Sequence, residues 1–112
     1  MELVIDLLQQ KNNYLLQFEK MGSFECQRLR TGDYSHIEQF YYSRQIILDA
    51  IENIDIQIRS YTPQQISKEH KETIKALFQK KRAITKSILQ QDITIHSYLN
   101  NLQYDVVEDQ TA

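Results

Sequence analysis

The sequence predicts an all-α protein: an antiparallel three-helix arrangement, in which a helical hairpin is followed by a longer third helix that overhangs it. The 112 residues include only two glycines and one proline, too few turn signals for a sheet protein. Apolar residues recur every three or four positions along most of the chain, which is the helical period. Two short breaks, at residues 31–33 and 60–63, divide this pattern into three helices of a single domain, residues 1–112.

The first helix is predicted over about residues 3–30. It has one apolar face, made of Val4, Leu8, Leu15, Phe18 and Leu29. Two bases in the last turn, Arg28 and Arg30, suit the negative end of the helix dipole. Gly32 ends the helix because glycine tolerates the left-handed conformation. We expect Gly22, inside the helix, to let the second helix approach closely.

The second helix is predicted over about residues 34–60, with Asp33 or Ser35 as its N-terminal cap. Its seam repeats about every 3.5 residues, as in paired helices. This seam is the strongest pattern in the chain and consists of Ile37, Phe40, Arg44, Ile47, Ile51, Ile54 and Ile58.

One charge interrupts this seam, at Arg44. Folding the chain into a hairpin places Arg44 opposite Glu19 or Lys20 of the first helix. We expect an ion pair between Arg44 and Glu19. The alternative is that the long side chain extends along the surface to reach water.

The third helix is predicted over about residues 63–102, followed by a flexible tail at residues 105–112. Thr62 caps its start, Pro63 occupies the first turn, and Gln65 can reach back as in a capping box. The apolar spacing then continues without a breaker through Ile66, Ile74, Leu77, Ile84, Ile88, Ile95, Tyr98 and Leu102.

This third helix is predicted to outlast the hairpin. Short connections make neighbouring helices antiparallel, so we expect the third helix to return along the second. Counting back from the break between them places Tyr34, at the start of the second helix, level with Leu89. The segment from Gln90 to about Leu102 would then project by roughly 20 Å. The alternative is a break near residues 90–92, with the end of the helix folded back over the hairpin.

The projecting segment carries the apolar residues Ile93, Ile95, Tyr98, Leu99 and Leu102. We interpret the apolar stripe that starts just before this segment and runs along it as a partner-binding surface. Exposed apolar stripes mark interaction sites, and an isolated helix of this length needs packing to be stable in water. The stripe consists of Ile88, Ile95, Tyr98, Leu99 and Leu102.

Two long stretches of the sequence carry a resemblance to a known family. In RLRTGDYSHIEQFYYSRQIILDAIENIDIQI, a Gly-Asp turn leads into a helix with an arginine and an isoleucine-leucine seam. The long helix of KALFQKKRAITKSILQQDITIHSYLNNL follows. Together they resemble the flagellar type III export chaperones of the FlgN/FliT type, over nearly the whole chain.

The resemblance implies a cytoplasmic chaperone of bacterial flagellum biogenesis. Such a protein binds an amphipathic helical segment of a late flagellar subunit, a hook-associated or filament-cap protein, and delivers it to the export apparatus. By resemblance, the client contacts are Ile88, Ile95, Leu99 and Leu102. The alternative is a self-associating coiled-coil structural or adaptor protein without an export role, in which a second copy forms a homodimer and covers the stripe.

Residues 68–86 contain seven bases and two acids, whereas the rest of the chain is acidic. Three of these bases are expected to pair with the second helix: Lys68 with Asp55, Lys71 with Glu52, and Lys75 with Asp49. The other four form a candidate docking patch for an acidic protein surface: Lys80, Lys81, Arg82 and Lys86. Phe78 is the only aromatic residue among them, which argues against nucleic-acid binding.

The sequence offers no constellation for catalysis, a metal or a cofactor, so we expect a protein that is not an enzyme. Its three histidines lack metal-ligand spacing, and two glycines cannot build a phosphate loop. The single cysteine, Cys26, allows no internal disulfide and fits a reducing cytosol. Acids at Glu2 and Asp6 and the short apolar runs argue against a signal peptide or membrane insertion. We therefore expect a soluble, cytoplasmic chain.

Overall fold

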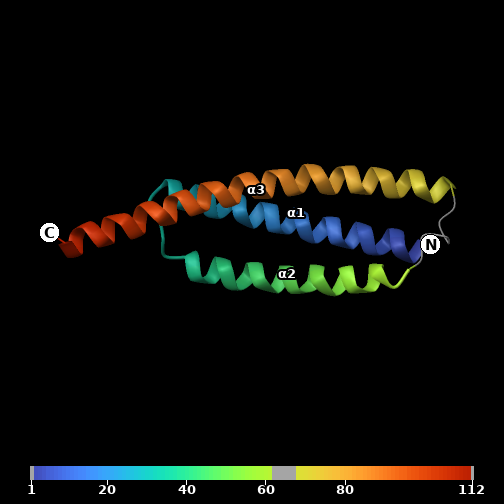
Figure 1. Cartoon of the computed structure of the whole chain (residues 1–112), viewed down its shortest axis with the longest axis horizontal. Coiled ribbons are helices and arrows are strands. Elements are labelled where there is room, and N and C mark those ends of the chain that lie inside the picture. The colour runs from blue at the N-terminus through green and yellow to red at the C-terminus, as the bar shows by residue number, and fades with distance from the viewer. Residues whose placement is uncertain (1, 62–67, 112) are drawn as a thin grey trace.

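The computed structural model describes the fold of residues 2–61 and 68–111, and the side chains of residues 3–61 and 68–101. Within these ranges the chain forms three helices and no strand: α1 (Glu2–Arg30), α2 (Ile37–Arg59) and α3 (Lys68–Thr111). The prediction of an all-α, three-helix fold is confirmed. The molecule is elongated, with extents of 66 × 21 × 19 Å, because all three helices run along one axis (Figure 1).

The turn between α1 and α2 shows why α1 ends where it does. Gly32 has a φ of +84°, the left-handed conformation that glycine was expected to supply. The amide of Gly32 donates to the carbonyl of Leu29 at 3.0 Å, and the amide of Asp33 donates to that of Arg28 at 2.9 Å. These two bonds form a Schellman motif and satisfy carbonyl groups that the helix end leaves free.

The start of α2 differs from the prediction. Asp33 accepts hydrogen bonds from the backbone amide of Ser35 at 3.0 Å and from its hydroxyl at 2.5 Å. Both groups are therefore used within the turn, and α2 begins only at Ile37, after His36, which forms no side-chain cap. The predicted capping of α2 by Asp33 or Ser35 is wrong, because their hydrogen bonds stabilise the loop instead of the helix.

The far end of the chain also differs from the prediction. The helix is continuous from Lys68 to Thr111, so the alternative break near residues 90–92 is wrong. The predicted end near residue 102 and the tail at residues 105–112 are also corrected, since the helix includes residues 103–111. The predicted cap at Thr62, Pro63 and Gln65 lies outside the described residues.

The central helix of the fold is α1. Both α2 and α3 pack on it, whereas no backbone contact joins α2 to α3 in the described part of the chain. In Figure 1, α2 runs antiparallel to α1, and α3 runs parallel to it. The third helix therefore returns antiparallel to the second, as expected, but its backbone packs on α1 and not on α2.

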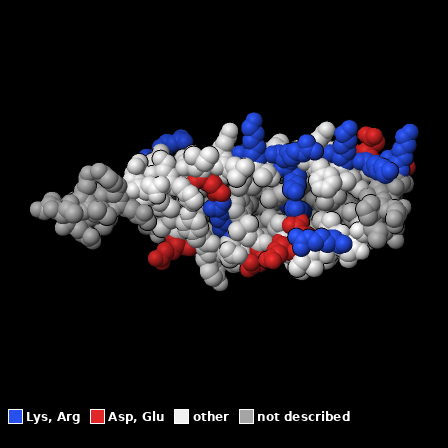
Figure 2. Space-filling model, in the orientation of Figure 1, with Lys and Arg blue, Asp and Glu red and all other residues white. Residues whose placement is uncertain are grey.

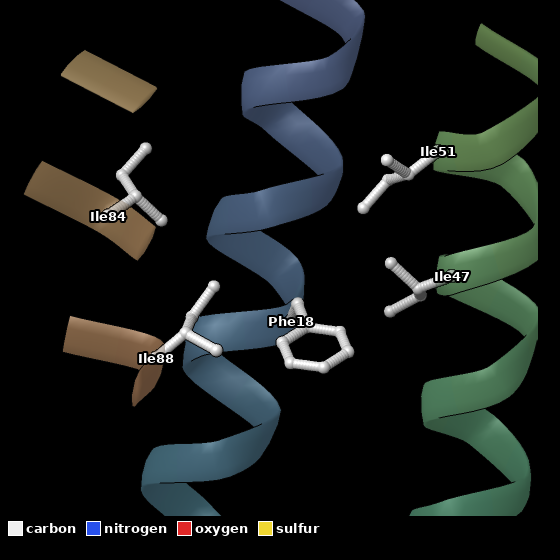
Figure 3. Packing of buried hydrophobic residues seen from close by; sticks show 5 residues of the cluster. All are labelled: Phe18, Ile47, Ile51, Ile84 and Ile88. Carbon is white, nitrogen blue, oxygen red and sulfur yellow. The ribbon is translucent and has the colours of Figure 1, made fainter. Parts of the chain in front are cut away.

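The hydrophobic core consists of two clusters. The first, here called the central cluster, contains Phe18, Ile47, Ile51, Ile84 and Ile88. Figure 3 shows Phe18 of α1 lying between an isoleucine pair from α2 and another from α3. The second, here called the loop-end cluster, contains Cys26, Leu29, Phe40 and Ile95. The predicted seam of α2 is confirmed, because its buried residues are Phe40, Ile47, Ile51 and Ile54.

These clusters set α3 in a different register from the predicted one. Tyr34 was expected level with Leu89, but it packs on the loop-end cluster together with Tyr98 and Leu99, nine and ten positions farther along α3. The hairpin therefore covers α3 well beyond Gln90, and the uncovered part of the helix is shorter than predicted.

Candidate functional site

Most of the predicted client-binding stripe lies in the core. Ile88 belongs to the central cluster, and Ile95, with 1% of its surface exposed, belongs to the loop-end cluster. Tyr98 and Leu99 are half-buried against the same cluster. The expectation that this stripe faces water is wrong for Ile88 and Ile95, because the register places α1 and the start of α2 over them, whereas Tyr98 and Leu99 keep part of their surface exposed. Leu102 lies outside the residues whose side chains are described.

What remains of the overhang is the last part of α3. The last described side chains of α3 that pack on the hairpin are Tyr98 and Leu99. The helix continues to Thr111 and extends past the loop that joins α1 and α2 (Figure 1). We call residues 102–111 the projecting end of α3.

A second apolar surface was not predicted. We call it the α2–α3 face, and its large apolar side chains are between 37% and 71% exposed. They are Tyr41, Leu48 and Ile56 on α2 and Phe78, Leu89 and Ile93 on α3. The ion pair of Arg44 with Asp92 locates this face, because Tyr41 and Leu48 lie three and four positions from Arg44, and Leu89 lies three positions from Asp92, the spacing of neighbours on a helix surface. The sequence contained a signal for this face, since these residues flank the buried positions at helical spacing.

Arg44 joins α2 to α3 across this face. Its Nη2 donates to Oδ1 of Asp92, and its guanidinium lies 4.3 Å from the ring centre of Phe18 and 5.6 Å from that of Phe40. The predicted pairing with Glu19 is wrong, because the aromatic ring of Phe18 occupies the surface of α1 that Arg44 faces. The contact with two rings is a cation–π arrangement.

The basic segment of α3 is also corrected. Asp55 pairs with Lys11 of α1 at 2.6 Å and not with Lys68. Lys81 is half-buried beside that pair: its burial, and then the charge of Lys11, lower the pKa of Lys81. Lys81 is thus part of a partly buried cluster and not of an open patch.

Five of the other bases of this segment form an exposed row along the outer edge of α3, whereas Lys80 is exposed on another side of the helix. The predicted pairs of Lys71 with Glu52 and Lys75 with Asp49 do not form among the described residues, because the register set by Arg44 and Asp92 places Glu52 near the level of Arg82 and not of Lys71. Exposed bases on α3 are Lys68, Lys71, Lys75, Lys80, Arg82 and Lys86. Figure 2 shows this basic edge above and acidic side chains along α2 below.

Gly22 lies against α3 and not against α2. A Cβ at this position would collide with the side-chain amide of Gln91. That amide donates to the backbone carbonyl of Glu19 at 2.8 Å, so Gln91 lies directly over Gly22. The expectation of a close approach is right, but the helix that approaches is α3.

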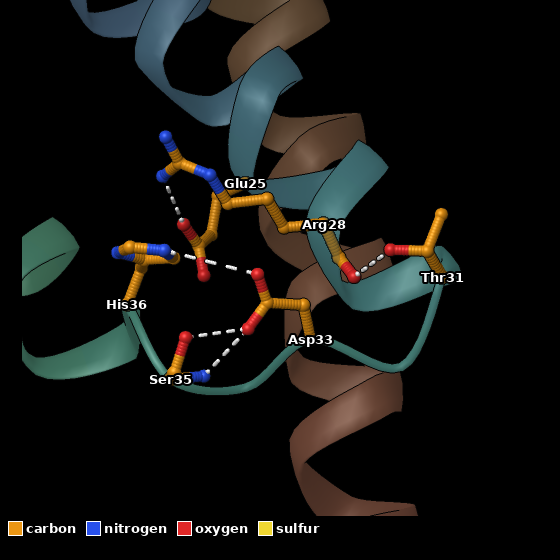
Figure 4. Close-up of polar contacts among 6 residues, drawn as sticks. All are labelled: Glu25, Arg28, Thr31, Asp33, Ser35 and His36. Carbon is orange, nitrogen blue, oxygen red and sulfur yellow. Dashed lines mark hydrogen bonds and ion pairs between the residues drawn. The ribbon is translucent and has the colours of Figure 1, made fainter.

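A buried carboxylate near the loop was not predicted. Glu25 is fully buried and accepts from Nη1 of Arg28 at 3.3 Å, while its other oxygen has no hydrogen-bond partner. Figure 4 shows these two side chains above Asp33, Ser35 and His36. Hydrogen bonds from the hydroxyl and then the amide of Ser35 lower the pKa of Asp33. These contacts fix the loop, but they form no enclosed catalytic constellation.

The described residues contain no group of three His, Cys, Asp or Glu side chains that could hold a metal ion. None of the helices, as far as their residues are described, is both long and apolar enough to cross a membrane. No family model, curated protein or solved structure matches the chain. The candidate sites are therefore two surfaces, the projecting end of α3 and the α2–α3 face.

Cys26 is expected to be inert in the native protein. The side chain is buried, its Sγ lies 3.9 Å from the backbone carbonyl of Gln91, and burial raises the pKa of the thiol. Because the thiolate is the reacting species, we expect native protein at pH 8 to react with a chromogenic disulfide reagent about a hundredfold more slowly than the same protein unfolded in guanidinium. Equal rates in the two states would contradict this burial.

Proposed function

We propose that the protein is an export-chaperone-like module of the cytoplasm, which binds an amphipathic helical segment of a late flagellar subunit through the projecting end of α3. One observation carries the proposal: α3 remains helical past the loop that joins α1 and α2. The resemblance to flagellar export chaperones of the FlgN/FliT type supports the nature of the client, a hook-associated or filament-cap protein. We also propose that the protein delivers this client to the export apparatus.

The client contacts that we propose lie closer to the C-terminal end of α3 than the contacts expected from the sequence. Ile88 and Ile95 are occupied in the core, so they cannot contact a client while the protein is folded. In the sequence, Leu102 and Val106 continue the helical spacing of Leu99. We therefore assign the client contacts to Leu99, Leu102 and Val106.

This contact set is small for a stable complex. Full burial of a large apolar side chain yields about 1.5–3 kcal/mol, whereas micromolar binding requires about 8 kcal/mol after the costs of association. A client must therefore extend beyond these three residues, along the neighbouring surface of the loop between α1 and α2. We expect affinities in the micromolar range or weaker for a single short peptide.

The test is calorimetric titration of the full chain with amphipathic peptides from hook-associated and filament-cap proteins. Binding should weaken at least about tenfold, a loss of about 1.4 kcal/mol, in Leu102→Asp and in Val106→Asp. The matched control is Ile46→Asp, because Ile46 is 56% exposed on a side of α2 that belongs to neither candidate surface. If no such peptide binds, or if Leu102→Asp binds as the unmodified chain does, the proposed function is wrong.

A further inference from the structure

The α2–α3 face exposes large apolar side chains of the kind that a binding partner usually covers. On α2, Tyr41, Leu48 and Ile56 recur at helical spacing and are exposed, and on α3 the same holds for Phe78, Leu89 and Ile93. Both helices pack on α1, and among the described residues they meet each other through side chains such as Arg44 and Asp92, without a close backbone contact. On the side of the molecule that faces away from α1, no other helix of the described chain therefore covers α2 and α3.

Charge is divided across this face. Acids predominate on α2, which exposes Glu38, Asp49 and Glu52 and one base, Arg59, whereas bases predominate on α3, which exposes six bases and two acids, Glu69 and Glu72. In Figure 2 most blue side chains lie along the upper edge, formed by α3, with a few red ones among them at its right end, and red side chains gather along α2 below. One chain thus presents both halves of a complementary pair, side by side and facing the same way.

The core contacts fix which residues of the two helices stand at the same level. Arg44 meets Asp92, and the central cluster joins Ile47 and Ile51 to Ile84 and Ile88. Because α2 and α3 run in opposite directions, a step forward on α2 corresponds to a step back on α3. Leu48 therefore stands near the level of Leu89, and Glu52 near the level of Arg82.

We propose that two copies of this chain associate through their α2–α3 faces, about a two-fold axis parallel to the long axis of the molecule. This rotation exchanges the two edges of the face and leaves the level of each residue unchanged. It therefore lays α3 of one copy, antiparallel, against α2 of the other. The contact is isologous, so every pairing occurs twice.

The alternative two-fold axis, across the long axis, is disfavoured by charge. It would place the basic edge of α3 against the same edge of the partner, and like charges across an interface are costly. In the proposed orientation, bases meet acids and apolar residues meet apolar residues at matching levels. The expected pairs between copies are Leu48 with Leu89, Tyr41 with Ile93, Ile56 with Phe78, and Glu52 with Arg82.

The match of charged and apolar residues indicates that a second copy of the chain covers the α2–α3 face. A client helix would need its own pattern of acids and apolar residues, whereas a second copy supplies both patterns at the required levels. The dimer uses a surface separate from the projecting end of α3, and it places the two projecting ends at the same end of the assembly. The proposal therefore stands or falls independently of the proposed function.

Sedimentation equilibrium of the full chain tests the association, and circular dichroism checks that each variant keeps its helicity. We expect a dimer at micromolar concentration whose dissociation constant rises at least about tenfold in Leu89→Asp and in Ile93→Asp. Ile46→Asp, on the opposite side of α2, is the matched control and should leave the constant unchanged. A chain that stays monomeric at every concentration, or a dimer that Leu89→Asp leaves intact, overturns the proposal.

A charge exchange tests the orientation. Glu52→Lys alone and Arg82→Glu alone should each weaken the dimer, and the double variant should recover most of the loss, because the two residues face each other across the axis. Oxidation of a Leu48→Cys and Leu89→Cys double variant, built on Cys26→Ala, should give a covalent dimer. Absence of both the charge recovery and the covalent dimer rules out this orientation. Binding of a flagellar peptide that Leu89→Asp abolishes would instead assign the face to the client.

Discussion

Ile95→Ala is expected to lower the free energy of unfolding by about 3 kcal/mol. Ile95 is 1% exposed and packs with Leu29, Cys26 and Phe40 in the loop-end cluster, so removing its side-chain atoms leaves a cavity between all three helices. Ile95→Asp should be more severe and leave little folded protein, because it adds a buried charge without a partner. Urea denaturation followed by circular dichroism measures both effects.

The control for this prediction is Ile46→Ala, which removes the same atoms from a side chain that is 56% exposed. A substitution at such a position usually changes stability by less than about 0.5 kcal/mol. Similar losses in the two variants would mean that Ile95 is not in the core. The result also decides how binding data are interpreted, since a client-binding defect in Ile95→Asp would reflect unfolding.

The sequence was sufficient to predict the helices and the buried seam of α2. Phe40, Ile47, Ile51 and Ile54 recur at a period that only a helix with one covered face explains. Gly32 was predictable for a similar reason, because the chain must adopt a left-handed conformation after α1 and glycine does so at the lowest cost. These features are local, so the spacing of a few residues determines them.

The neighbour of α3 could not be predicted in this way. Periodicity identifies Ile88 and Ile95 as one face of a helix, but it does not say which molecule covers that face. Which helix covers this face depends on contacts between residues that are distant in the sequence. Gly22 leaves room for Gln91 to lie on α1, and Phe18 packs against isoleucines of both α2 and α3. A register counted from a tight turn therefore placed the hairpin too far from the end of α3.

The α2–α3 face escaped prediction for a related reason. Leu89 and Ile93 lie outside the buried seam, and single exposed apolar residues are common on protein surfaces. They indicate a binding surface only once the structure shows them near Tyr41 and Leu48, around the ion pair of Arg44. In the same way, the partner of Arg44 was expected on α1, because no pattern in the sequence indicates that α3 brings a carboxylate to it.

Asp92→Ala is expected to lower the free energy of unfolding by about 3 kcal/mol, the cost of leaving one member of a largely buried ion pair alone. The Arg44 side chain is 13% exposed, its Nε is buried without a hydrogen-bond partner, and Phe18 and Phe40 lie around it. Once Asp92 is removed, the guanidinium loses the carboxylate that compensates for its burial. Thermal and urea unfolding measure the loss.

The matched experiment replaces both partners. Arg44→Leu with Asp92→Leu removes the two charges together and extends the central cluster toward the surface, so the double variant should be close in stability to the unmodified protein. Arg44→Leu alone should cost less than Asp92→Ala, because Asp92 is 32% exposed and can be hydrated by water. The reverse order, with Arg44→Leu the more damaging change, would mean that the stacking of Arg44 on Phe18 outweighs the ion pair. In that case the link between α2 and α3 would depend on packing and not on charge.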